Sequence, residues 1–136
     1  MWTYSQFLSF LSDICLLFPR FNQWFLNSTC TGLMQIWRMG CDGSGQMQMT
    51  FHERNNWFAH VSPDGSKVVY LSYRKGDLDA NEHLPNMQVE LWVMNADSSN
   101  PHRVISMFGG QGSINVNSWA GDSRHLAFIS YEPVHK

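Results

Sequence analysis

The sequence contains residue types that bind metals, but their spacing fits no complete metal site. Asp77, Asp79 and Asn81 alternate as the first ligands of a calcium-binding loop do. That loop also needs a glycine at its sixth position and a bidentate glutamate at its twelfth, where this chain has Glu82 and Gln88. We therefore predict no calcium site.

The histidines, cysteines and glycines indicate no other cofactor. None of the six histidines forms an H-x-x-x-H pair, and His60 beside an apolar run is predicted to be a core residue. The three cysteines contain no C-x-x-C pair, so neither a zinc cluster nor a disulfide framework is indicated. Gly110 to Gly112 lacks the third glycine of a phosphate loop and is expected to be a turn. The sequence predicts no metal and no cofactor.

Composition predicts one folded domain. The chain has 136 residues, with six Trp, four Tyr and nine Phe, which is too aromatic for a disordered tail. Nine Lys and Arg stand against eleven Asp and Glu without a basic run. We therefore expect no nucleic-acid partner, because nothing here would neutralise a row of phosphates.

The N-terminal apolar run predicts neither a signal peptide nor a membrane span. No Lys or Arg precedes Phe7 to Phe18, and Asp13 interrupts the run. It is also shorter than the roughly 20 residues needed to cross a bilayer. The sequence assigns no compartment.

The elements that would position the polar residues fall into two regions. Apolar residues at three and four spacing predict an amphipathic helix over residues 4 to 18, and Pro19 would end it. We predict an atypical helical segment at 1–22 and a β region at 23–136. Within the second region, strands are expected at 67–73, 89–94, 103–107 and 125–131, separated by Gly, Asp, Asn and Pro turns.

The β region contains two internal matches at nearly the same period. Leu33 to Met39 resembles Gln88 to Met94, with Trp37 matching Trp92, and we call this pair the Trp repeat. Ser62 to Tyr73 resembles Ala120 to Tyr131, and we call this pair the turn–strand repeat. The residues that carry the repeated motif are Trp37, Asp42, Gly43, Ser62, Pro63, Asp64, Gly65, Trp92, Trp119 and Asp122.

These residues resemble the repeat of TolB-type β-propellers, a WD-repeat-like arrangement, over about 23 to 131. The resemblance implies a noncatalytic interaction protein, since the known relatives are largely periplasmic and noncatalytic. The same repeat forms the propeller part of prolyl-oligopeptidase relatives. Ala120 and Gly121 stand where the family has Ser and Pro, and Gly40 and Cys41 where it has Asn and Pro.

The predicted fold is mainly β: a partial β-propeller of roughly two blades, each a four-stranded antiparallel sheet, with one N-terminal amphipathic helix. A ring needs at least four blades of about 40 residues each, or roughly 160 residues. Either copies of the chain complete a ring as a homo-oligomer, or the chain is a fragment of a longer protein.

The predicted binding surface lies on the longer connections. In an up-and-down meander, the turns at 62–66 and 96–101 fall at one end and the connections 52–57, 74–86 and 108–115 at the other. The candidate binding residues are His52, Glu53, Arg54, Asn55, Asn56, Asp77, Asp79, Asn81, Glu82, His83, Gln111 and Asn115. They suit a protein, peptide or carbohydrate partner, and the alternative is a set of solvated loops without a partner.

The predicted function is noncatalytic binding. The alternative is the propeller portion of a prolyl-oligopeptidase-like serine peptidase that lacks its catalytic domain. The chain has no G-x-S-x-G motif, so the nucleophile of such a peptidase is missing from it. A third possibility is a fragment with no selected activity. We predict no catalytic residue in this chain.

Overall fold

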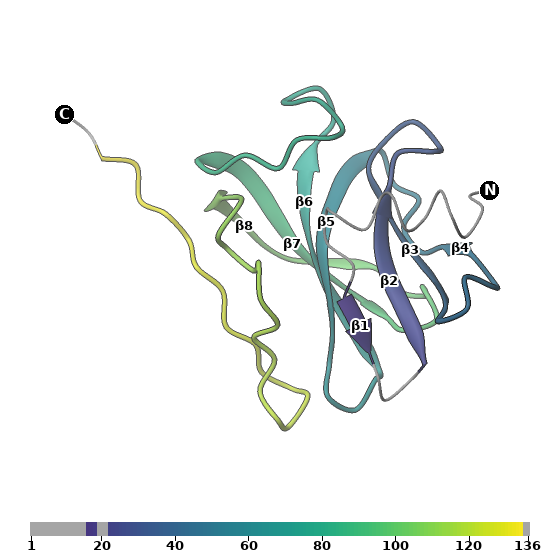
Figure 1. Ribbon diagram of the computed structural model, residues 1–136. Helices are drawn as coiled ribbons and strands as arrows, with labels where there is room; N and C mark the ends of the chain where they lie inside the picture. Colours follow the sequence, from purple (N-terminus) through teal and green to yellow (C-terminus); the bar gives the residue numbers. More distant parts are fainter. Residues whose placement is uncertain (1–15, 19–21, 135–136) are drawn as a thin grey trace.

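Two four-stranded antiparallel sheets make up the protein in the computed structural model, which describes residues 16–18 and 22–134 (Figure 1). The strands of the first sheet are β1 (Leu16–Phe18), β2 (Gln23–Ser28), β3 (Gln35–Gly40) and β4 (Met47–Gln48). The strands of the second are β5 (Arg54–Val61), β6 (Lys67–Arg74), β7 (Met87–Asn95) and β8 (His102–Gly109). Neighbours in sequence are neighbours in each sheet, so both are simple meanders. The prediction of a mainly β protein with two four-stranded antiparallel sheets is confirmed.

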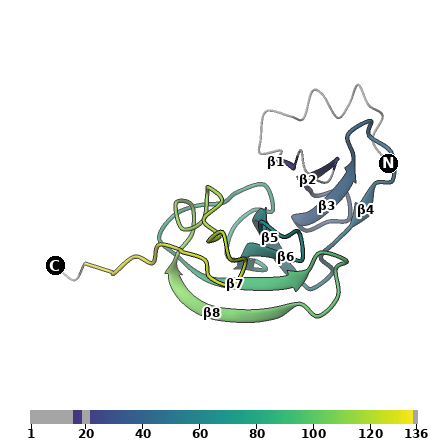
Figure 2. The same ribbon diagram turned by 90° about the horizontal axis from the view of Figure 1, so that it is seen from below.

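Strand β6 is covered on both faces, as its continuous apolar run predicts. Val68 and Tyr70 pack toward the first sheet, against Phe25 and Ile36. Val69, Leu71 and Tyr73 belong to a second core that also contains residues from the C-terminal segment. In Figure 2 the first sheet and the yellow C-terminal segment lie on opposite sides of β5 and β6. The second sheet is therefore the central layer.

The Trp repeat is followed by the same turn geometry in both copies. The Asp42 carboxylate accepts hydrogen bonds from the backbone N–H of Ser44 at 3.0 Å and from its hydroxyl. Asp97 accepts the same two bonds from Ser99. Gly43 and Ser98 stand at equivalent places with φ of 83° and 75°. The sequence match thus reflects an equivalent backbone after β3 and after β7.

The turn–strand repeat brings its two turns into contact. Gly65 has a φ of 77°, and Ser123 adopts the equivalent left-handed conformation with a φ of 58°. The Ser123 hydroxyl accepts a hydrogen bond from the Asp64 backbone N–H at 2.9 Å. The turn that follows the second sheet therefore lies against the turn within it.

The predicted strand at 125–131 is wrong as a regular element. Leu126 forms one isolated bridge with Trp119, and the segment has no other strand assignment. The equivalent strand β6 has a partner along each of its edges, β5 and β7. We attribute the difference to the missing second partner, because a strand gains regular geometry from its ladders.

The predicted helix over 4–18 meets the described residues only at its end, where it is wrong. Residues 1–15 lie outside the described part of the chain. Leu16–Phe18 form β1, with Leu16 opposite Phe25 in β2. Pairing with β2 overrides a local helical pattern here, since propensity is weaker than tertiary context. Within 16–18 and 22–134, no helix is long and apolar enough to cross a membrane.

Candidate functional site

The longer connections of the second sheet meet at one end of it. Arg54 at the start of β5 pairs with Arg74 at the end of β6, and Met87 at the start of β7 pairs with Gly109 at the end of β8. We call the segments at this end, Phe51–Glu53, 75–86 and 110–115, the loop face. The turns at 62–66 and 96–101 lie at the opposite end and form the turn face. This is the separation that the meander predicts.

Leu84 joins two segments of the loop face. Its carbonyl oxygen accepts a hydrogen bond from the Tyr73 hydroxyl at 2.9 Å and another from the Gln111 N–H at 3.2 Å. Gly110 makes this approach possible, because a Cβ at its position would lie 2.2 Å from the same oxygen. Its φ of 124° also favours glycine. The 75–86 connection is therefore fixed to the 110–115 connection.

His83 fixes the same connection to strand β5. Its ring centre lies 4.6 Å from that of Trp57 and 5.2 Å from that of Phe58, in edge-on geometry. Phe58 has a φ of 57° at the bulge between Trp57 and His60, which is rare for a bulky residue. His83 thus contributes packing as well as a polar group.

The outer part of the loop face is polar and mostly exposed. Asp77, Asp79, Asn81, Glu82, Gln111 and Asn115 are exposed. The Asp79 N–H donates to Glu82 at 3.1 Å, and the Gly112 N–H donates to Asn115 at 2.8 Å. Glu53 and Lys75 form an ion pair of 3.3 Å between two segments. Their exposed fractions of 83% and 55% mean that solvent screens this pair.

His52, within the loop face, and Arg54, at the start of β5, both contact β7. The His52 ring centre is 4.6 Å from that of Trp92, and its Nε2 is 3.3 Å from the Tyr70 hydroxyl. Arg54 forms an ion pair with Glu90 at 3.4 Å. Burial lowers the pKa of His52, the Arg54 charge lowers it further, and Glu90 opposes both. The neutral imidazole is therefore favoured in this aromatic setting.

The prediction of a connection at 52–57 is wrong beyond Glu53. Arg54 to Trp57 belong to β5, and Asn55 and Asn56 are only 1% and 0% exposed. The Asn55 side-chain oxygen accepts from the Met34 N–H at 2.9 Å, and Asn56 donates to Gln35 at 2.9 Å. These polar side chains join the two sheets, because buried backbone and amide groups need partners. They do not contribute an accessible surface.

Two apolar residues of the loop face are not predicted by the sequence patterns. Phe51 is 70% exposed and Leu84 is 45% exposed. The sequence signals are Phe51 between two strand patterns and Pro85, which disfavours a helical conformation for Leu84. Large exposed apolar side chains among polar ones are typical of interaction surfaces.

The remaining predicted residues are structural. Trp37 lies in β3, Trp92 in β7 and Trp119 in the bridge to Leu126. His60 is buried, and its Nε2 contacts the Ile114 carbonyl. Across residues 16–18 and 22–134, no three His, Cys, Asp or Glu side chains lie together as a metal site would need.

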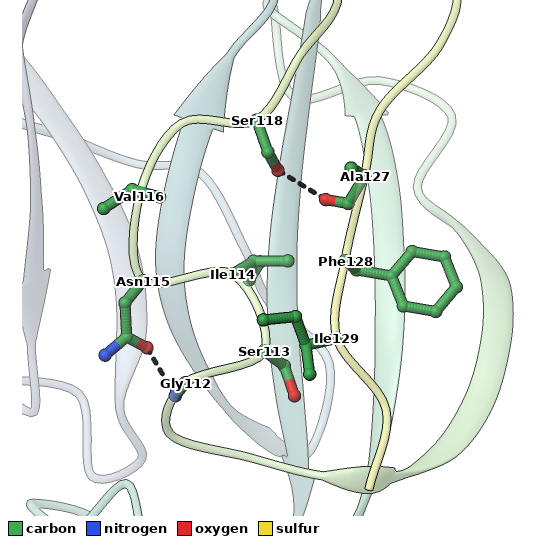
Figure 3. A pocket seen from close by; sticks show the side chains of 9 residues that line it. All are labelled: Gly112, Ser113, Ile114, Asn115, Val116, Ser118, Ala127, Phe128 and Ile129. Atoms are coloured by element: carbon green, nitrogen blue, oxygen red, sulfur yellow. Dashed lines mark hydrogen bonds between the residues drawn. The ribbon is translucent and has the colours of Figure 1, made fainter.

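An apolar pocket of about 380 Å³ lies beside the loop face. Figure 3 shows Ile114, Val116 and Ile129 at this pocket, with a hydrogen bond from Ser118 to the Ala127 carbonyl closing one side. Its few polar groups already have partners within the chain, as Asn115 does with Gly112. We assign no chemistry to it.

The comparisons with known proteins agree with this architecture. No family model matches the chain. A solved structure, "The structure of putative TolB from Agrobacterium tumefaciens", is similar with a TM-score of 0.79 and 37% sequence identity, over 85% of this chain and 41% of that one. The fold is TolB-like. The chain is also 39% identical over 110 residues to "Uncharacterized protein Atu1656" of Agrobacterium fabrum, which covers 81% of this chain and 36% of that protein.

The comparison with the solved structure shows a TolB-like fold over part of that longer chain. The chain spans 36% of the curated relative and 41% of the solved structure. The closed propeller and a binding partner are predictions, and so is the peptidase alternative.

Proposed function

We propose that this chain is a noncatalytic binding module of TolB-like propeller architecture that holds a polypeptide partner on its loop face. The observation that carries the proposal is the pair of exposed apolar residues, Phe51 and Leu84, within a polar surface. Protein interfaces combine such apolar anchors with a polar rim.

The charge of the loop face favours one kind of polypeptide. Its carboxylates are Glu53, Asp77, Asp79 and Glu82, against Lys75, which pairs with Glu53, and the exposed Arg74 beside it at the end of β6. A partner with Lys or Arg beside an apolar side chain would complement both features. A carbohydrate would use the amides and carboxylates and stack the C–H face of a sugar ring on Phe51, but a neutral sugar carries no positive charge to complement the carboxylates.

The loop face needs no covalent step to act. Leu84, Gly110 and His83 hold the connections against the second sheet before any partner arrives. Binding to loops that are already ordered costs less conformational entropy than binding to free ones. The proposed mechanism is therefore recognition by a surface that is already formed.

Selection from a random peptide library displayed on phage would test the proposal. We expect the selected peptides to carry Lys or Arg beside an apolar residue. Their affinity should fall at least about tenfold for a double variant with Phe51→Ser and Leu84→Ser, because apolar anchors dominate such interfaces.

A double variant with Met47→Ser and Val104→Ser is the matched control. Both residues are exposed and apolar, at 41% and 51%. Both lie toward the turn face: Met47 pairs with Arg38, which donates to the Ala96 carbonyl, and Val104 is near the start of β8, after the 96–101 turn. Its affinity for the selected peptides should change less than about twofold. Equal losses in both double variants, or none in the loop-face variant, would contradict the proposal.

A further inference from the structure

The segment 125–131 is hydrogen-bonded along one edge. The N–H groups of Ala127, Ile129 and Tyr131 donate to the carbonyls of Ser118, Ser113 and Phe108, at 3.1, 3.0 and 2.7 Å. In an extended chain, the backbone groups of alternate residues point to opposite edges. Those of Leu126, Phe128 and Ser130 therefore point away from these partners. Among the described residues, none accepts from the N–H of Phe128 or Ser130.

The turn–strand repeat shows which element belongs on this open edge. In that repeat, Leu126, Phe128 and Ser130 correspond to Val68, Tyr70 and Ser72 of β6. In the second sheet these three residues lie opposite Met94, Trp92 and Glu90 of β7. The open edge is thus the place that β7 takes in the sheet before it.

A groove of about 590 Å³ runs beside the open edge. One wall is Leu91, Val93 and Val104 of the second sheet, and the other includes Trp119, Leu126 and Phe128. In the core between the first and second sheets, side chains of β7 fill the space that corresponds to this groove. Met94 is 0% exposed there, and Trp92 packs against the same cluster. The groove therefore lacks the two side chains that a third strand would supply.

We propose that this open edge binds, as an added antiparallel strand, an extended polypeptide with large apolar side chains at alternate positions. Main-chain hydrogen bonds to Leu126, Phe128 and Ser130 would hold the strand, and the groove would select its apolar side chains. A second copy of the chain is a poorer occupant, because its own β7 is already paired with β6 and β8. The proposed surface is separate from the loop face.

A peptide with the sequence of Met87–Asn95 and a terminal lysine tag is the direct probe. Added in trans to the full chain and followed by fluorescence anisotropy of a label on the tag, it should bind saturably. Replacing its Trp92 and Met94 by Lys should weaken binding at least about tenfold, since both side chains would enter the groove. Replacing Leu91 and Val93 of the peptide by Lys should change its affinity less than about threefold, because these two peptide side chains would face solvent.

A second pair of peptides tests the backbone alone. N-methylation at Glu90, Trp92 and Met94 should abolish binding, because these N–H groups would face Phe128 and its neighbours. N-methylation at Val89, Leu91 and Val93 should be tolerated. On the protein side, Phe128→Pro removes one N–H of the open edge and leaves the bonds of Ala127 and Ile129 in place. This variant should bind the unmodified peptide at least about tenfold more weakly, and its far-UV circular dichroism spectrum should match that of the parent chain.

Three results would overturn the proposal. The first is no saturable binding, and the second is equal losses for the two Lys-substituted peptides. The third is a dimer by light scattering that Phe128→Pro converts to monomer, which would assign the edge to a second copy. The loop-face variant with Phe51→Ser and Leu84→Ser should bind the strand peptide normally, so the two proposals can fail separately.

Discussion

The ring of His83 lies edge-on to the ring of Trp57, with their centres 4.6 Å apart and their planes at 67°. His83 belongs to the 75–86 connection, whereas Trp57 is a buried residue of β5. This contact, with the hydrogen bonds to the Leu84 carbonyl, makes the connection part of the folded layer. The loop face is therefore a surface with defined positions.

Removing the His83 ring should loosen the loop face. We expect His83→Ala to lower the free energy of unfolding by about 1–2 kcal/mol, because it removes two aromatic contacts. Urea denaturation measures the loss, and faster limited proteolysis within 75–86 would show its location. Asn81→Ala, at an exposed position of the same connection, should change stability by less than about 0.5 kcal/mol. Equal effects would contradict the anchoring role.

Gly110→Ala should be among the most damaging small substitutions. The new Cβ would lie 2.2 Å from the Leu84 carbonyl oxygen, so the two connections would have to separate. We expect a loss of at least about 2 kcal/mol in the free energy of unfolding. Gly32→Ala is the control, with a similar φ of 107° but no atom within 4 Å, and should cost about 1 kcal/mol. Similar losses at both positions would mean that backbone strain, and not this contact, makes Gly110 necessary.

Glu90 should matter more to stability than Glu53. It accepts a hydrogen bond from the Trp92 indole at 2.8 Å and pairs with Arg54 at 3.4 Å, both partly buried. We expect Glu90→Gln to lower the free energy of unfolding by about 1–2 kcal/mol, because Arg54 loses its counter-charge. Glu53→Gln, in a solvent-screened pair, should change it by less than about 0.5 kcal/mol. Chemical denaturation at low and high salt checks both, and a larger effect at Glu53 would refute this assignment.

Asp64 should titrate well below an ordinary aspartate. Hydrogen bonds from the Ser66 backbone, then from the Ser62 and Ser66 hydroxyls, lower its pKa from 3.8 to about 2. Because the folded-state pKa lies below the unfolded value, its contribution to stability is present above about pH 4 and is lost as the pH falls toward 2. NMR titration of the carboxyl carbon measures this pKa. Ser66→Ala should raise it toward 3.8, and an unchanged value would contradict the turn geometry.

Local turn chemistry and apolar runs were the predictable part of the fold. The Asp and Gly residues at 42–43 and 64–65 predicted turns, and the apolar run at 67–73 predicted a strand covered on both faces. Each of these signals acts within a few residues. The internal repeat indicates two four-stranded sheets, and the resemblance of the repeated residues to a known family implies the TolB-like fold.

The errors concern residues whose state depends on distant partners. Asn55 and Asn56 are polar, which predicts a loop, but Met34, just before β3, and Gln35, its first residue, supply their hydrogen bonds. Residues 125–131 have the composition of a strand but lack a second neighbouring strand. Phe51 and Leu84 were missed because nothing in local sequence distinguishes an exposed apolar residue from a buried one.

The most direct test of the loop-face account is a chemical-shift map. The ¹⁵N-labelled chain would be titrated with the tightest peptide selected from the library, and amide shifts followed by NMR. The account predicts that the largest changes fall on Phe51–Glu53, Leu84 and Gln111, with the turn at 96–101 unaffected. Largest changes at the turn face, with Leu84 and Gln111 unmoved, would contradict it.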